Sequence, residues 1–203
     1  MFSGAQLSLY PMCDDFVAVI LEAVDALEPY RPRFRIETDD VSTLIVGPPE
    51  EIFPAMRDLF VSASGAGVHC VLSAAVSRGC PGEPDDDICT PSAHFGTAAP
   101  LDERIAAARD AVAKAGLTEI EVAAQFSLYP LGGSHHMEEI YGCIDFLKSS
   151  GVFEKSKNFC TKLRGDAGPV FATLSEAFLR FGAPNGHVAL DLTVSANSPT
   201  RIG

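Results

Sequence analysis

The sequence contains one stretch of residues twice, and this duplication constrains the fold more than any other feature. Residues 5–11 read AQLSLYP and residues 124–130 read AQFSLYP, so the two segments differ at a single position. Further identities follow at a constant offset of 118 residues: Thr43/Thr161, Gly47/Gly165, Phe53/Phe171, Phe60/Phe178, His69/His187, Val76/Val194 and Ser77/Ser195. The chain is therefore one module written twice, which predicts two similar sites related by a pseudo-two-fold axis.

Both copies show the same order of secondary-structure patterns. The first copy predicts, by apolar periodicity and turn residues, a strand, a helix, a hairpin, a helix and a strand at residues 5–11, 16–27, 34–46, 52–60 and 68–77. The second copy repeats this order at residues 121–130, 136–149, 152–157, 159–165, 167–181 and 187–196. The order βαββαβ is that of a ferredoxin-like fold, an α+β class with an antiparallel sheet and both helices on one face.

These patterns divide the chain into three parts. We expect a first ferredoxin-like repeat at residues 1–78, a linker with a connecting helix at 79–118, and a second repeat at 119–203. Residues 78–100 are rich in Pro, Gly and Asp, whereas residues 102–116 are rich in alanine, a strong helix former.

Charge and cysteine content limit the classes of function. The formal net charge is −12 and no local basic patch is evident, which argues against nucleic-acid binding. The six cysteines form no CxxC pair, and the sequence shows neither a leader segment nor an apolar run of roughly 20 residues. These features predict reduced thiols and a cytoplasmic location.

Thr43 and Thr161 are candidate ligand-contacting residues. Each lies mid-strand with apolar residues two positions away on both sides, so the strand period places each threonine on the helix-facing side. A buried hydroxyl needs a hydrogen-bond partner. That partner is either a neighbouring protein group or a small molecule, and the sequence leaves both open.

The repeated Leu-Tyr-Pro corner is the second candidate. Leu9 and Leu128 share the face of the threonines on the adjacent strand, just before the chain leaves the ladder. Backbone N–H and C=O groups become available to a small molecule at such a point. Tyr10 and Tyr129 either wall this cleft or serve as rim aromatics without a ligand.

Other residue patterns give weaker signals. His69 and His187 fall on the face opposite the threonines, which favours an interface role. His135-His136 lacks an acidic or cysteine ligand at suitable spacing, so we expect no metal site. The sequence has no Ser-His-Asp order, P-loop or GxGxxG motif, and it therefore gives no support for catalysis.

The last strand of the first copy has a second face that is only semi-polar. His69, Val71, Ser73, Ala75 and Ser77 alternate with the core-facing residues, and this set is too apolar for open water. We expect another sheet to cover it, from either the sister copy or a second chain.

Four segments together resemble the YkoF family of thiamin and hydroxymethylpyrimidine (HMP) binding proteins. They are SLYPM-DDF at residues 8–16 with Cys13 inserted, GCPG at 79–82, GDA--VF-TL at 165–174 and SANSP at 195–199. The resemblance covers nearly the whole chain, including the duplication.

The resemblance implies a tight homodimer of ACT-like repeats with one small-ligand site per repeat and no separate cofactor. It further implies recognition of the pyrimidine half of thiamin, and a role in salvage beside a membrane transporter. The family pattern places the Leu of the SLYP segment and the strand threonine at the ligand, here Leu9 with Thr43 and Leu128 with Thr161. The loop after the second corner lacks the paired aspartates of the first, so we expect the two sites to differ.

Three rival interpretations remain at this stage. An ACT-like amino-acid sensor needs a cation for the ligand carboxylate, and no Arg or Lys is kept in both copies. An enzyme acting on a thiamin precursor needs a nucleophile or acid–base pair at the site, and none is evident. A structural dimer without a ligand is not separated from a weak binder by sequence alone.

The six cysteines generate the first testable prediction. Because we expect a reducing compartment, all six should be free thiols in the native protein. Rapid alkylation followed by mass spectrometry should show six adducts per chain, and a stoichiometric disulfide would contradict the compartment argument.

Overall fold

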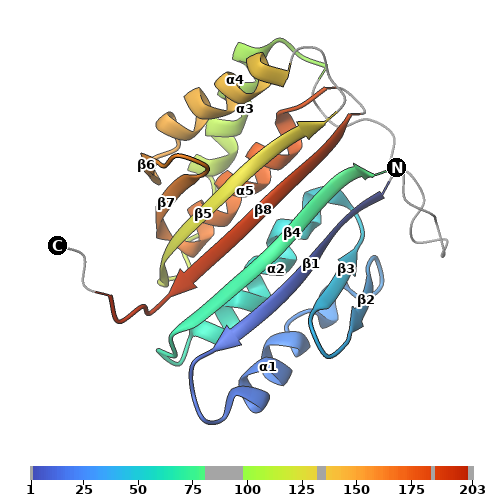
Figure 1. Cartoon of the computed structure of the whole chain (residues 1–203), viewed down its shortest axis with the longest axis vertical. Coiled ribbons are helices and arrows are strands. Elements are labelled where there is room, and N and C mark those ends of the chain that lie inside the picture. Colours follow the sequence, from blue (N-terminus) through green and yellow to red (C-terminus); the bar gives the residue numbers. More distant parts are fainter. Residues whose placement is uncertain (1, 81–97, 132–135, 184–185, 201–203) are drawn as a thin grey trace.

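The computed structural model describes residues 2–80, 98–131, 136–183 and 186–200. Six elements form the first repeat: β1 (Phe2–Pro11), α1 (Phe16–Asp25), β2 (Arg35–Thr38), β3 (Thr43–Val46), α2 (Pro49–Ser64) and β4 (Cys70–Cys80). Six equivalent elements form the second: β5 (Glu121–Leu131), α4 (His136–Ser149), β6 (Phe153–Ser156), β7 (Thr161–Asp166), α5 (Ala167–Arg180) and β8 (His187–Ala196). The predicted tandem ferredoxin-like repeats are thus confirmed (Figure 1).

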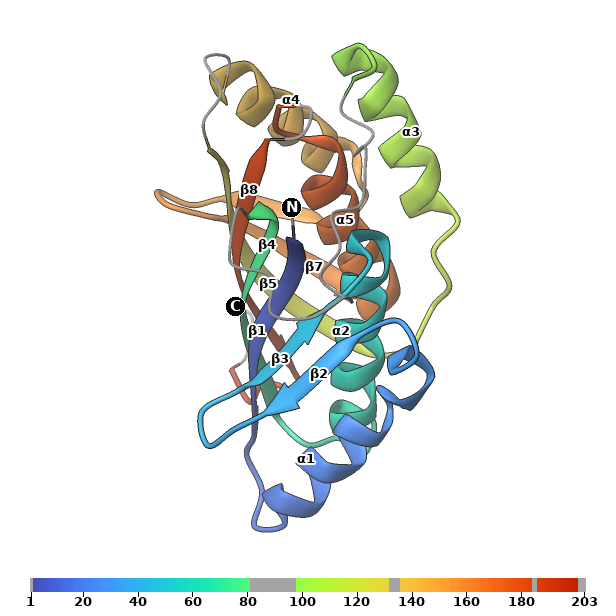
Figure 2. The same ribbon diagram turned by 90° about the vertical axis from the view of Figure 1, so that its right-hand side faces the viewer.

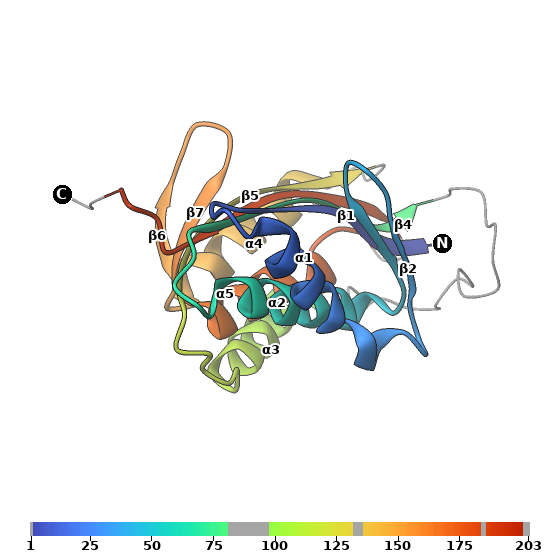
Figure 3. The same cartoon turned by 90° about the horizontal axis from the view of Figure 1, so that it is seen from below.

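A helix at Leu101–Ala113, α3, lies between the repeats in the sequence, within the segment predicted to hold a connecting helix. Residues 81–97 of that segment, and His135 of the histidine pair, lie outside the described residues. α3 lies on the same side of the sheet as the other helices but farther from the strands, and it packs against α4 and α5 (Figures 2 and 3). Within the described residues, no helix combines the length and apolarity required to cross a bilayer.

The eight strands form one continuous antiparallel sheet rather than two sheets that face each other. The strand order is β2-β3-β1-β4-β8-β5-β7-β6, so the repeats join edge to edge where β4 pairs with β8. The expectation that the sister copy could cover the second face of β4 is therefore wrong. Joining edge to edge removes two exposed strand edges, and a face-to-face arrangement would leave both of them open.

The two faces of β4 follow the predicted alternation. Leu72, Ala74 and Val76 are buried beneath the helices, whereas Val71, Ser73 and Ala75 on the other face are partly or fully exposed. The neighbouring strand β8 behaves alike, with Ala189, Asp191 and Thr193 facing outward. This outward surface of β4 and β8, which we call the bare face, carries mostly small side chains at its centre.

The core across the repeat boundary follows the pseudo-two-fold axis. Phe53 on α2 contacts Phe178 on α5 with ring centroids 5.5 Å apart, and Phe60 contacts Phe171 at 6.1 Å. Because Phe171 is the counterpart of Phe53 and Phe178 that of Phe60, the two contacts are symmetry mates. The duplicated phenylalanines are therefore retained as the shared core of both repeats.

The duplicated histidines obey the same symmetry on the bare face. His69 Nε2 lies 3.3 Å from Ser195 Oγ, and His187 Nε2 lies 2.9 Å from Ser77 Oγ. Each histidine therefore bonds a serine of the other repeat, as expected for an interface residue.

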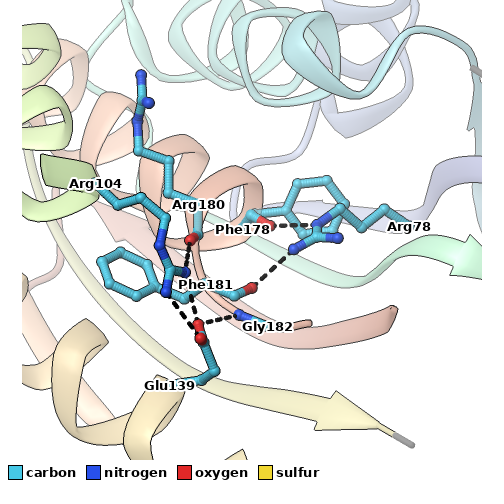
Figure 4. Close-up of polar contacts among 7 residues, drawn as sticks. All are labelled: Arg78, Arg104, Glu139, Phe178, Arg180, Phe181 and Gly182. Atoms are coloured by element: carbon cyan, nitrogen blue, oxygen red, sulfur yellow. Dashed lines mark hydrogen bonds and ion pairs between the residues drawn. The ribbon is translucent and has the colours of Figure 1, made fainter. Parts of the chain in front are cut away.

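Each repeat also caps a helix of the other. Arg78 of β4 is fully buried, and its guanidinium donates to the carbonyls of Phe178 (2.6 Å) and Phe181 (2.8 Å) at the end of α5 (Figure 4). At the other end of the β4–β8 pair, Asn197 Nδ2 donates to the carbonyls of Ser64 (3.0 Å) and Val68 (2.9 Å) after α2. These bonds satisfy helix-terminal carbonyls that have no intrahelical donor.

A second arginine, on the connecting helix α3, binds close to the end of α5. Arg104 of α3 donates to both carboxylate oxygens of Glu139 on α4, at 2.8 and 2.9 Å, and to the Arg180 carbonyl at 2.6 Å (Figure 4). Glu139 also accepts the Gly182 N–H at 2.8 Å. Burial alone would raise the pKa of Glu139, but the bonds from Arg104 and Gly182 hold that pKa below its ordinary value.

Arg78→Met should destabilise the protein strongly. The substitution keeps the apolar length of the side chain but leaves the carbonyls of Phe178 and Phe181 buried without a donor. We expect a loss of about 2–5 kcal/mol in the free energy of unfolding, measured by urea denaturation. The control Arg31→Met removes an exposed ion pair with Glu28 and should cost less than about 1 kcal/mol. Equal stability of the two variants would refute the capping role.

Candidate functional site

Each repeat contains a cavity where a short strand stops pairing with a longer one. β3 pairs with β1 as far as Leu7 and Thr43, and residues 8–11 of β1 continue beside β4 alone in the described pairings. In the second repeat, β7 pairs with β5 as far as Phe126 and Thr161, and residues 127–131 continue beside β8 alone. The outer edge of each continuing strand leaves backbone donors and acceptors for a ligand.

The first cavity has a volume of about 360 Å³ and lies between β1, α1 and the turn of the β2–β3 hairpin. Its floor includes Leu9 and Thr43, and its outer wall is formed by Phe16, Ile20 and Val24 of α1. This volume falls within the usual range for small-molecule sites.

The second cavity has a volume of about 290 Å³ and the same construction. Leu128 and Thr161 lie on the floor, and Ile140, Cys143 and Ile144 of α4 form the wall. The counterparts of Ile20 and Val24 are Ile140 and Ile144, at an offset of 120 residues. The two cavities are therefore the same site built twice.

All six residues predicted from the sequence line these cavities. Leu9, Tyr10 and Thr43 line the first, and their counterparts line the second: Leu128, Tyr129 and Thr161. The tyrosines lie at the rim, with 53% of Tyr10 and 49% of Tyr129 exposed. Strand alternation directs each tyrosine toward the bare face, away from the adjacent leucine.

The hydroxyl of Thr43 is pre-positioned by a neighbour. Thr43 is only 6% exposed, and its Oγ1 lies 3.0 Å from Thr38 Oγ1 on the adjacent strand. A hydroxyl has one donor and two acceptor positions, so this single bond leaves capacity for a ligand. In the second cavity Ser156 is paired across the strands with Thr161 and likewise lines the cavity.

The hairpin turns at the cavity mouths were not predicted as site residues. In the first, the Asp39 N–H donates to the Ser42 carbonyl (3.0 Å), and in the second the Lys157 N–H donates to Cys160 (2.8 Å). Ser8 Oγ anchors the first turn through the Val41 carbonyl (3.0 Å). The sequence feature that could have pointed to these turns is Ser8, because the SLYP segment contains this serine in both copies.

The second turn has the matching anchor. Ser127 Oγ donates to the Phe159 carbonyl at 2.7 Å, at the position where Ser8 binds Val41. Phe159 itself is 90% exposed at the tip of the turn. Each turn is therefore fixed to its cavity by one retained serine.

Cys143 and Cys160 line the second cavity. Their counterpart positions in the first repeat are Ala23 and Ser42. Cys143 is buried, and burial raises the pKa of its thiol well above the ordinary range. Cys160 is partly exposed beside the turn. Because only a thiolate is a strong nucleophile, Cys143 is poorly suited to covalent chemistry.

The lining of both cavities, as far as it is described, consists mostly of apolar and hydroxyl-bearing side chains. No histidine is among the described residues that line them, and no buried acid–base pair is present there. Across the described residues, no three His, Cys, Asp or Glu side chains are gathered closely enough to hold a metal ion. The arrangement offers an apolar slot, one hydroxyl pair and a free strand edge.

Comparison with known proteins finds the same duplication. A model of the family described as "YKOF-related Family" matches residues 2–83 and again residues 121–201, so it finds both repeats. A protein of Bacillus subtilis (strain 168), named "Putative HMP/thiamine-binding protein YkoF", is 32% identical over 199 residues. That alignment covers 98% of this chain and 92% of the relative.

Proposed function

The chain belongs to the YkoF-related family, and we propose that it binds thiamin or HMP, one molecule in each cavity, without catalysing a reaction on them. The observation that carries this proposal is the equivalence of the two cavities. Each combines an apolar slot, a strand threonine and an unpaired strand edge at the same positions.

An aminopyrimidine ring complements these groups. Its flat apolar faces suit a slot between Leu9 and the side chains of Ile20 and Val24. Its ring nitrogens accept hydrogen bonds and its amine donates them, so the Thr43 hydroxyl and the free edge of β1 supply partners of both kinds. The rest of the ligand then points to the mouth, beside the hairpin turn.

Rival functions find less support in the lining residues. An amino-acid sensor needs a cation in both sites, and the described residues that line the first cavity include no Lys or Arg. An enzyme needs an activated nucleophile, which the buried Cys143 thiol does not provide. Binding in the cytoplasm for thiamin-precursor salvage, with delivery from a membrane transporter, fits a non-catalytic carrier.

Thr43→Val should weaken the first site and leave the second nearly unchanged, and Thr161→Val should do the reverse. Loss of one neutral hydrogen bond costs about 0.5–1.5 kcal/mol, roughly 2- to 13-fold in affinity. Isothermal titration with thiamin and with HMP measures both sites. Valine preserves shape and strand propensity, and thermal unfolding checks the fold.

Thr43→Ser and Thr161→Ser are the matched controls, because serine keeps the hydroxyl. They should retain affinity within about twofold. If both valine variants, and the double variant, bind as the parent does, the threonines are core residues and the site assignment is wrong.

We also propose that two chains pack through the bare face to form a homodimer. The small side chains of this face suit close packing of two sheets. Ala75→Arg, in the middle of the face, should then produce monomers, whereas Ala106→Arg on exposed α3 should not. Sedimentation at micromolar concentration checks this: a parent mass of one chain, 21.5 kDa, would contradict the proposal.

A further inference from the structure

The two cavity mouths carry opposite charge. The first turn presents Asp39 and Asp40 to its cavity, and these two aspartates are the charged side chains among the described lining residues. At the equivalent positions, 118 residues later, the second turn presents Lys157 and Asn158. Lys157 is the one charged side chain among the described residues that line the second cavity.

The charges occupy the same place relative to each cavity. Both turns are closed by the same backbone bond, from Asp39 to Ser42 and from Lys157 to Cys160. The serine anchors, Ser8 and Ser127, fix both turns to the strand that forms the cavity floor. A substituent that leaves either cavity therefore passes a turn of the same shape and opposite sign.

Hydrogen bonds hold a charged side chain of each turn in place. Asp39 Oδ1 accepts the N–H groups of Val41 and Ser42, both at 2.8 Å, and these bonds hold the pKa of Asp39 below its ordinary value. Lys157 Nζ donates to Gln125 Oε1 at 3.0 Å. This partner is a neutral amide on the bare-face side of β5, so the ammonium group keeps its charge and reaches a substituent at the cavity mouth by turning away from Gln125.

We propose that the two cavities sort ligands by charge: the first prefers a pyrimidine with a cationic substituent, and the second prefers one with an anionic substituent, such as a phosphate ester. This inference rests on the proposed function, because it assumes that the pyrimidine occupies the slot and the substituent reaches the mouth. The thiazolium of thiamin is the cation and the phosphate of HMP phosphate is the anion.

The expected size of the effect follows from the exposure of the mouths. Exposed ion pairs contribute about 0.2–1 kcal/mol, which corresponds to roughly 1.5- to 5-fold in affinity for each charge. The first cavity carries two aspartates, so attraction to a cation there should reach the upper part of this range or exceed it. Screening by salt should shrink the effect, since the Debye length falls from about 10 Å at 0.1 M to about 3 Å at 1 M.

Variants in which one of the two cavities is filled by a large side chain test the proposal directly. Val24→Trp should fill the first cavity and Ile144→Trp the second, and these residues are counterparts in the two helices. Each protein is titrated with neutral HMP, cationic thiamin and HMP phosphate. We expect thiamin to bind more tightly than HMP phosphate in the first cavity, with the order reversed in the second.

Charge variants of the otherwise unaltered chain give a second, independent test. Asp39→Asn with Asp40→Asn keeps an acceptor for the turn and should weaken thiamin binding to the first cavity by about two- to tenfold, with HMP unchanged. Lys157→Asp installs the residue of the first turn and should convert the second cavity to a thiamin preference. Raising the salt concentration to 1 M should remove most of each difference.

Titration with the three ligands distinguishes failure of the binding function from failure of the charge preference. If neither thiamin nor HMP binds either cavity, the proposed function fails and the charge sorting fails with it. If HMP binds both cavities, but the ratio of thiamin to HMP phosphate affinity is the same in both and is unmoved by Lys157→Asp, the charge sorting is overturned and the binding function stands.

Discussion

Hydrogen bonding between β4 and β8 determines where the rest of the chain lies. The pairing runs from Cys70 opposite Ala196 to Arg78 opposite Val188, and it makes one sheet of two repeats. It brings α2 against α5, so the duplicated phenylalanines meet in symmetric pairs, and it places Arg78 and Asn197 at helix ends in the opposite repeat. Each repeat contributes to the core of the other and binds carbonyls at the end of the other's second helix, so we expect the two copies to fold as one unit.

Local patterns in the sequence predicted the elements well and their assembly poorly. Alternation and helical spacing located the strands and helices because those signals are set by nearby residues. Helical spacing predicted α2 from residue 52 to residue 60, whereas the helix begins at Pro49, ends at Ser64 and contains Pro54. The predicted last strand of the first repeat ended at Ser77. Arg78 is nevertheless inside the strand and fully buried, because its partners are carbonyls about 100 residues away that no local pattern reveals.

The candidate site was predictable where the duplication marked it. Leu9, Thr43 and their counterparts stood out because both copies keep them, and each pair shares a cavity with its own helix wall. The wall residues were harder to assign, since Ile20 and Ile140 look like any apolar helix positions. The hairpin turns were not predicted as site residues because Asp39 and Lys157 differ between the copies. A comparison of identical positions therefore does not mark them. Positions that changed after duplication carry as much information as those that did not.

The helices that wall the two cavities are held unequally, and this asymmetry has a dynamic consequence. α4 is bound through Glu139 to Arg104 of α3, and four of its described residues are buried: Gly142, Cys143, Phe146 and Leu147. In α1, the residue matching Glu139 is Val19, and Ala23 is the buried residue. We therefore expect local opening of α1 to require less free energy than opening of α4, which amide hydrogen exchange would register as faster exchange along α1. If a ligand binds as proposed, the first cavity would admit it through opening of its wall, with a larger loss of conformational entropy on closure than at the more firmly held second cavity.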